Sequence, residues 1–413
     1  MLGPQRSSAN TKYLLLFWLG RTFLGLSFNT FGFMVYWLVE QQTHKVQALL
    51  VLGFLSMGAH WFSGLGGVWA DQYETTSLLK GFAGITALML GITSVWTRQT
   101  HQISVMILMI IYGLIVSLQN ASASLFRTAP LQWVPKSQWP SLNALNGIVG
   151  RLAVMASGLL DLLIFHFSMS MVWRFAFPAG AAVFAGLLWM PLGRATIVTE
   201  MKRQVNDHHF ESKLNRHTLA EIWQLSAFRN LTLLLALANV FAMPFLHLLP
   251  AWSGQILHTG NQGYFSFKVS DAVGLLAGYG ISYWLSKKAV TPMKGVRIGL
   301  LLQLVIFSFP WLRGLWLPLA AVTLMGISDG IQDTYIISLL QRYVPDDMQG
   351  RMFGILTLIV GGIAGPVGLA IVMGLSLELS LEAIFIVSSI GIGLVTLVLL
   401  RYSLVPLHKP GVK

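Results

Sequence analysis

Long runs of hydrophobic residues alternate with short polar segments over almost the whole chain. Each run is close to the ~20 residues that an α-helix needs to cross a bilayer. The sequence contains twelve such runs, and we expect each to form a transmembrane helix. They lie at residues 14–38, 46–70, 76–96, 103–127, 141–165, 171–191, 227–250, 264–285, 295–312, 316–341, 351–375 and 381–401. This pattern predicts an all-α, multi-pass membrane protein.

The composition agrees with that prediction. Hydrophobic residues make up 55% of the chain and charged residues 10%, whereas a soluble globular protein carries about 25% charged residues. The chain contains no cysteine, which excludes disulfides and thiol chemistry. The first run is too long for a signal-peptide core and has no small-residue cleavage site, so we expect it to remain as a span.

The net charge of +12 is distributed unevenly. Basic residues precede the first run, fill the segment between the sixth and seventh runs, and follow the last run. The loops of the opposite side hold only Lys45, Arg98, Arg174 and Arg313. This is the positive-inside asymmetry, and it places both termini in the cytoplasm. The basic excess is therefore a topology signal, so we expect a lipid bilayer and no nucleic acid as partner, in a bacterial inner membrane.

Two related turns indicate an internal repeat. Val134-Pro135 and Val344-Pro345 each follow one apolar run and precede a glycine-rich one, about half a chain apart. Two parallel halves of six helices each are the plan of many transporters. We therefore expect one six-helix bundle at residues 1–192 and a second at 227–413.

The segment at 193–226 is polar and basic, and we expect it to be a cytoplasmic linker. Thr218 and Glu221 form a capping-box pattern ahead of apolar residues, which predicts a short amphipathic helix on the membrane surface. His208, His209 and His217 lack nearby cysteines or spaced acids. We expect a solvated loop there and no metal.

Two aspartates, Asp329 and Asp333, lie deep inside the tenth run. A carboxylate near the bilayer centre costs on the order of 2.5–3.5 kcal/mol. A spacing of four residues puts both on one helical face, where two negative charges would repel each other. We expect the pair to retain one proton, to face water, a partner cation or a proton path, and to be the proton-coupling residues.

Other polar residues within the runs are candidates for a substrate cavity. The first run carries Arg21, Asn29 and Tyr36 on one face with glycines. This stripe either lines a cavity or packs closely through glycine, with Arg21 snorkelling to the surface. Gln119 in the fourth run either lines the cavity or attaches neighbouring helices to each other. The remaining candidates are Arg151, Asn239 and Gln332.

Arg151 lies near the midplane of the fifth run, where a cation needs a partner anion. Asp329 and an anionic substrate are the two options. In the seventh run, Pro244 and Pro250 predict a bend or break. Between them, His247 is expected to be a structural or surface-facing residue rather than a proton carrier.

The turn after the second run resembles the cytoplasmic loop signature of the Major Facilitator Superfamily, G-x-x-x-D-R-x-x-R-[RK]. Gly67 and Asp71 match its glycine and aspartate, whereas Gln72 replaces its first arginine. The resemblance implies that the first, fourth, seventh and tenth spans line a cavity. It also implies that Asp71 meets the helix that restarts at Arg351 when the cytoplasmic side closes.

In that fold the fifth and eighth spans face each other. We therefore expect Asp161 and Lys268 to pair and to help close an outer gate. The alternative is that both are solvated at the membrane surface.

Within the superfamily, the G-G-x-x-A-D turn, the restart V-P-x-x-x-x-x-R-M-F-G and the length are most similar to bacterial exporters of the siderophore (enterobactin-type) and macrolide group. This implies proton-driven export of an amphipathic small molecule by a monomer. No phosphate-binding loop, zinc ligand set or Ser/His/Asp arrangement is recognisable, so we expect neither an enzyme nor a cofactor. An importer of a nutrient or metal chelate, and a non-transporting sensor or assembly protein, remain as alternatives.

Overall fold

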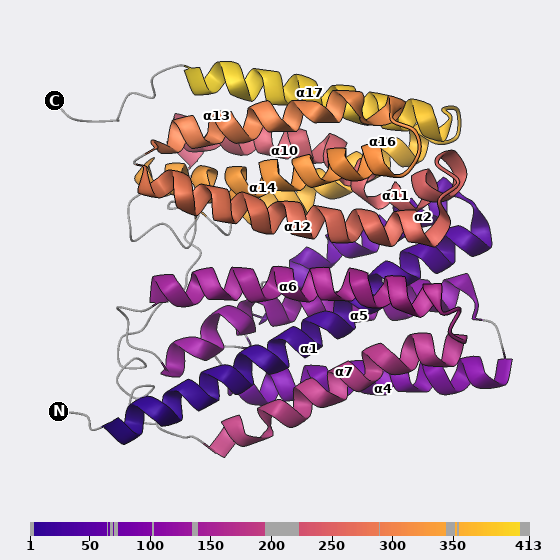
Figure 1. Cartoon of the computed structure of the whole chain (residues 1–413), viewed down its shortest axis with the longest axis vertical. Coiled ribbons are helices and arrows are strands. Elements are labelled where there is room, and N and C mark those ends of the chain that lie inside the picture. The colour runs from indigo at the N-terminus through magenta and orange to yellow at the C-terminus, as the bar shows by residue number, and fades with distance from the viewer. Residues whose placement is uncertain are drawn as a thin grey trace. The chain divides into compact units, whose positions relative to one another are not determined.

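In a computed structural model of the chain, all regular secondary structure among the residues that the structure describes is helical (Figure 1). The structure describes residues 4–63, 65, 66, 69, 73–100, 103–133, 139–194, 223–288, 290–343, 352 and 355–404. Its contacts divide the chain into two compact units. Unit 1 comprises residues 1–35 and 59–213, and unit 2 comprises residues 36–58 and 214–413.

In the part of the chain that the structure describes, nine helices are long and apolar enough to cross a membrane. The three predicted ranges without such a helix, 46–70, 264–285 and 316–341, still coincide with helices. The first of these helices is short, and polar side chains lower the hydropathy of the other two. The all-α, multi-pass prediction is thus confirmed, and the number twelve stays a prediction.

Unit 1 is built from the first part of one long helix and from four further long helices. They are α1 (Pro4–Thr43), α4 (Thr75–Thr100), α5 (Val105–Thr128), α6 (Trp139–His166) and α7 (Met171–Trp189), with the short helices η1 (Ala59–Trp61), η2 (Ala129–Trp133) and η4 (Met190–Arg194). Buried aromatic rings join the ends of these helices. Trp189 donates from Nε1 to the carbonyl of Phe17 at 3.2 Å, and the Phe17 and Trp133 rings lie 5.6 Å apart.

Helices α4 and α7 lie side by side in unit 1 (Figure 1). Small residues allow this close approach. Ala83 on α4 and Ala182 and Ala185 on α7 are all completely buried, and a Cβ at Gly186 would lie 3.7 Å from that of Ala83. In a membrane, where helix association depends on close packing, small side chains are the expected contact surface.

Unit 2 contains the end of α1 and most of the second half of the chain. Its helices are α2 (Val46–Gly58), α10 (Ser226–His247), α11 (Leu249–Ala251), η5 (Trp252–Ile256), α12 (Gly260–Lys287), α13 (Pro292–Gln303), η6 (Leu304–Trp311), α14 (Trp316–Tyr343), η8 (Leu358–Ala364), α16 (Gly365–Leu375) and α17 (Leu381–Leu404). Phe245, Trp252, Phe309 and Phe385 form a buried aromatic core, with the Trp252 and Phe385 rings 4.4 Å apart.

The predicted break in the seventh span is observed. Helix α10 ends at His247, one turn after Pro244, and Leu248 has φ −93° and ψ 0°. A new short helix begins at Leu249 with Pro250 in its first turn and continues as the π-helical turn η5. A proline cannot donate to the preceding turn, so two prolines six residues apart interrupt the helix here.

The segment 36–58 packs within unit 2, although its first part, 36–43, continues α1 from unit 1 without a break. Gln47 on α2 donates to the carbonyl oxygen and to the Oγ of Ser376, both at 3.2 Å. A Cβ at Gly53 would lie 3.0 Å from a methyl carbon of Leu369. Helix α1 is therefore shared, with its residues up to Val35 in unit 1 and its last two turns or so, from Tyr36, in unit 2.

Several predicted features lie outside the described residues. These are the loop residues Gly67 and Asp71, the restart at Arg351, and the linker from 195 to 222 with its expected surface helix.

Candidate functional site

A glycine seam holds α12 against α14 in unit 2. Gly274 and Gly278 on α12 face Gly326 and Gly330 on α14. A Cβ at Gly330 would collide with the carbonyl oxygen of Leu275 and lie 3.0 Å from the Cα of Gly278. Backbone thus touches backbone along two turns, which fixes the rotation of α14 about its own axis.

The two aspartates of α14 lie beside this seam. Asp329 follows Gly326 by three residues, and Asp333 follows Gly330 by three, so both acids flank the glycine face. Asp333 is exposed and Asp329 is half-buried. Tyr279, the residue after Gly278, donates from its hydroxyl to Oδ2 of Asp333 at 3.1 Å. The seam therefore positions a phenol donor next to the second acid.

Gln332, the neighbour of Asp333 in sequence, lies on a different face of α14. It is 8% exposed, and its amide nitrogen donates to Oε1 of Gln303 and to Oγ of Ser328, both at 2.7 Å. Ser328 in turn donates to the carbonyl of Gly299 at 2.8 Å. These bonds join α14 to α13, so packing accounts for the polarity of Gln332, which was expected to line a cavity.

In unit 1, the polar stripe of α1 meets α5. Asn29 donates from Nδ2 to the carbonyl of Gly25, one turn earlier, at 2.7 Å. Gln119 on α5 donates to Oδ1 of Asn29 over a long 3.5 Å. Both side chains are partly exposed. The structure thus brings together two of the predicted cavity residues and leaves part of each accessible.

About two turns earlier on α1, Arg21 lies against aromatic rings and α6. Its guanidinium carbon is 5.1 Å from the centre of the Phe126 ring and 5.7 Å from that of Trp18. A Cβ at Gly150 would lie 3.1 Å from Nη2 of Arg21, so this glycine makes room for the cation. Arg151 is partly exposed and makes no hydrogen bond or ion pair with the residues that the structure describes.

In unit 2, the end of α1 meets α10. Oη of Tyr36 lies 2.7 Å from Nδ1 of His247, and the two rings stack with centroids 5.4 Å apart. His247 thus has the structural contact that its position suggested. Asn239, two turns earlier on α10, donates to the carbonyl of Val360 in the π-helical turn η8 at 3.1 Å. Asn239 therefore helps to attach η8 to α10.

The predicted gate residues lie in different units. Asp161 on α6 is completely buried, and neither carboxylate oxygen has a hydrogen-bond partner among the described residues. Solvation at the membrane surface is therefore wrong for Asp161. Nζ of Lys268 on α12 lies 5.6 Å from the centre of the Tyr264 ring, with Asp271 three residues further along the same helix.

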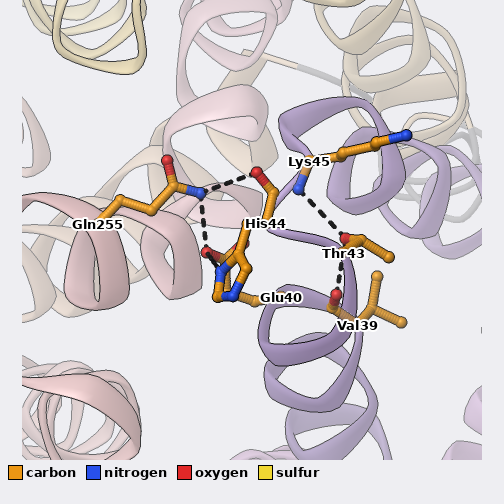
Figure 2. Close-up of polar contacts among 6 residues, drawn as sticks. All are labelled: Val39, Glu40, Thr43, His44, Lys45 and Gln255. Carbon is orange, nitrogen blue, oxygen red and sulfur yellow. Dashed lines mark hydrogen bonds and ion pairs between the residues drawn. The ribbon is translucent and has the colours of Figure 1, made fainter.

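Glu40 is a buried acid that the sequence analysis did not single out. It is 1% exposed, and its Oε1 accepts a hydrogen bond of 2.8 Å from Nε2 of Gln255 on η5 (Figure 2). Nδ1 of His44 lies 3.6 Å from the same oxygen. Glu40 lies two residues after the predicted first span, 14–38. An acid so close to an apolar run was the feature of the sequence that could have identified it as a candidate.

Comparisons with known proteins agree with this fold. The model of the Major Facilitator Superfamily matches residues 17–369, and no curated protein matches the chain significantly.

Among solved structures, the chain is similar to a D-xylose-proton symporter at 14% identity and a TM-score of 0.68, covering 97% of this chain and 98% of that one. It is similar to a POT family transporter in complex with 5-aminolevulinic acid at 10% identity and a TM-score of 0.71, covering 95% and 96%. For the nucleoside transporter NupG the identity is 13%, the TM-score 0.60 and the coverage 94% and 99%. At such low identities the likeness shows the fold alone.

Proposed function

Because the chain belongs to the Major Facilitator Superfamily, we propose that it couples the movement of an amphipathic small molecule to protons by alternating access. The chain is a multi-pass membrane transporter of small molecules and not an enzyme. Proton coupling, the direction of transport and the substrate class are our proposals. We place the protein in a bacterial inner membrane as a monomer.

The observation that supports coupling is the arrangement of Asp329, Asp333 and Tyr279. A membrane helix tolerates an acid chiefly where water, a partner or a proton path meets it. Asp333 is exposed and accepts a hydrogen bond from Tyr279, while half-buried Asp329 lies one turn away on the same face. Such a pair of acids can gain and lose a proton while the hydroxyl of Tyr279 remains in position to donate to Asp333.

We propose the following cycle. Proton uptake from outside neutralises one of the two acids and favours release of substrate. The return to the inward-open state lets the proton leave on the other side, with Arg151 or Arg21 compensating the negative charge. Asn29, Gln119 and Tyr36 supply polar contacts to the substrate, and the gate pair Asp161 and Lys268 closes the outside.

For the direction and substrate we propose export of a siderophore-like or drug-like molecule, since the loop after the second span and the restart at Arg351 resemble exporters of that kind. Import is the second candidate. One of the structures similar to this chain is a sugar-proton symporter by its description, and symport with protons moves a substrate inward.

Asp329→Asn and Asp333→Asn test the coupling in proteoliposomes with an imposed pH gradient. We expect at least one of them to abolish proton-driven flux while substrate exchange without a gradient continues, because an amide cannot carry the proton. Glu378→Gln, which changes an exposed acid in the turn after α16, is the matched control. Undiminished coupling in both aspartate variants would exclude these acids.

The sign of flux relative to the gradient distinguishes export from import, and the compounds that accumulate in cells without the protein provide the candidate substrates.

A further inference from the structure

Helix α1 presents a mechanical problem for alternating access. It runs unbroken from Pro4 to Thr43, yet its residues up to Val35 pack in unit 1 and those from Tyr36 onward pack in unit 2. Alternating access in such folds is largely a rocking of one bundle against the other. A continuous helix that is attached to both bundles has to release one attachment in each cycle.

One carboxylate takes part in the attachment of the last turn of α1 to unit 2, next to the contacts of Tyr36 with His247 and of Trp37 with Tyr264. Glu40 Oε1 accepts a 2.8 Å hydrogen bond from Nε2 of Gln255, and the same nitrogen donates at 3.2 Å to the carbonyl of His44 (Figure 2). Both amide protons of Gln255 are thus used on α1 and on the turn that ends it. Gly254 lies beside them, since a Cβ there would be 3.5 Å from Oε1 of Glu40 and 3.7 Å from the ring of Trp37.

The surroundings of Glu40 do not favour a negatively charged carboxylate whose role is structural only. Glu40 lies in the last turn of α1, where the helix dipole opposes negative charge, and that turn contains no basic residue. Its second oxygen, Oε2, is buried and has no hydrogen-bond partner among the described residues. Among the described residues the carboxylate has one hydrogen-bond donor, Gln255, and the imidazole of His44 at 3.6 Å, so most of its hydrogen-bonding capacity is unused.

Water is nevertheless close. The side chain of His44 is 72% exposed while that of Glu40 is 1% exposed, although the two are one helical turn apart. The residue at the helix end, His44, has φ +50°, and its N–H donates to the carbonyl of Glu40 at 2.9 Å. A small displacement of this last turn would transfer the carboxylate from a protein donor to water.

We propose that Glu40 and Gln255 form a releasable latch that holds the outer end of α1 on unit 2 during one half of the transport cycle. Glu40 acts as a positioning residue, and the chemistry of the latch is a carboxylate–amide contact that water can replace. This inference rests on the proposed alternating access, but it makes no use of Asp329 or Asp333. It also differs from the gate pair Asp161 and Lys268, because both of its members lie in unit 2.

Cysteine labelling tests the latch, since the chain contains no cysteine. Val39 is completely buried next to Glu40, so Val39→Cys reports on release of the last turn to a membrane-impermeant maleimide. We expect Glu40→Ala and Gln255→Ala each to raise the labelling rate about tenfold, the factor that one lost hydrogen bond permits. Glu40→Gln retains an acceptor and should stay within about twofold of the parent. Gln42→Ala, at an exposed position of the same turn, is the matched control.

Transport kinetics separate a latch from a purely structural contact. A latch controls the rate of exchange between states, so Glu40→Ala should change the maximal rate and leave KM within about twofold. Unchanged labelling in both alanine variants, in protein that elutes as a single folded species, would overturn the latch. The two proposals can fail separately. If Glu40→Ala raises the labelling rate but both aspartate variants keep their proton coupling, the proposed proton site is overturned and the latch is retained.

Discussion

Tyr36 and His247 stack at 5.4 Å and share a hydrogen bond of 2.7 Å between Oη and Nδ1. The pair joins α1 to α10 at His247, the last residue of α10 before the break. Gly53 on α2 permits it, since a Cβ there would lie 3.0 Å from the imidazole. Three helices of unit 2 thus meet around one imidazole ring.

Tyr36→Phe should weaken this junction without removing the stack. The phenyl ring keeps its place over the imidazole, and the loss of one partly buried hydrogen bond costs about 1 kcal/mol. We expect a lower midpoint of thermal unfolding in detergent, together with a changed transport rate. A variant as stable as the parent would show that the stack, and not the hydrogen bond, joins α1 to α10.

Gly330→Ala should separate α12 from α14. The added methyl would meet the backbone of α12, which cannot rotate away, and overpacking of this kind costs about 1–3 kcal/mol. Gly280→Ala is the matched control, because a Cβ at Gly280, on the same α12, meets nothing within 4 Å. Folded yield and thermal stability should fall only in the first variant. Equal values for both would contradict the glycine seam.

Tyr279→Phe and Asp333→Asn should not act independently. The phenol donates directly to Oδ2 of Asp333. An amide at position 333 can still accept this bond but cannot carry the proton, so both changes affect the same proposed step. Each single variant is expected to slow proton-driven flux. Adding Tyr279→Phe to Asp333→Asn should then change the rate by less than about twofold. Fully multiplicative effects would mean that Tyr279 acts elsewhere.

Local features of the structure could be predicted from the sequence because their causes are local. Apolar runs of sufficient length predicted where helices lie, and Pro244 and Pro250 predicted the break after α10. The placement of Asp329 and Asp333 on one face followed from their spacing alone.

Contacts between distant segments could not be predicted in the same way. Gln332 and Asp333 are adjacent, yet one is buried against α13 and the other exposed beside Tyr279. In an apolar helix no hydrophobic stripe indicates the inward face, so the rotation of α14 depends on its glycines and its neighbours. Glu40 was missed because nothing in the first span indicates that its end packs with Gln255, 215 residues away.

Gln332→Leu should reduce stability and leave proton coupling intact. The substitution removes the two hydrogen bonds of 2.7 Å that Gln332 donates to Gln303 and Ser328, and each such bond contributes about 0.5–1.5 kcal/mol. Thermal unfolding in detergent measures the loss, and flux per folded molecule under a pH gradient measures the coupling. If coupling were lost in protein of unchanged stability, Gln332 would belong to the substrate cavity and its bonds to α13 would be incidental.

Exchange of the two proposed gate charges tests whether Asp161 and Lys268 act together. Asp161 is buried without a hydrogen-bond partner among the described residues, so its carboxylate gains most from a cation that approaches in another state of the cycle. Asp161→Asn and Lys268→Gln should each slow transport, because each removes one of the two opposite charges of the proposed pair. The double variant Asp161→Lys/Lys268→Asp should recover part of the rate, since opposite charges attract in either order. Leu163→Asn, at an exposed position on α6, controls for a new polar group on that helix. Failure of the double variant to exceed either single variant would show that the two residues do not pair.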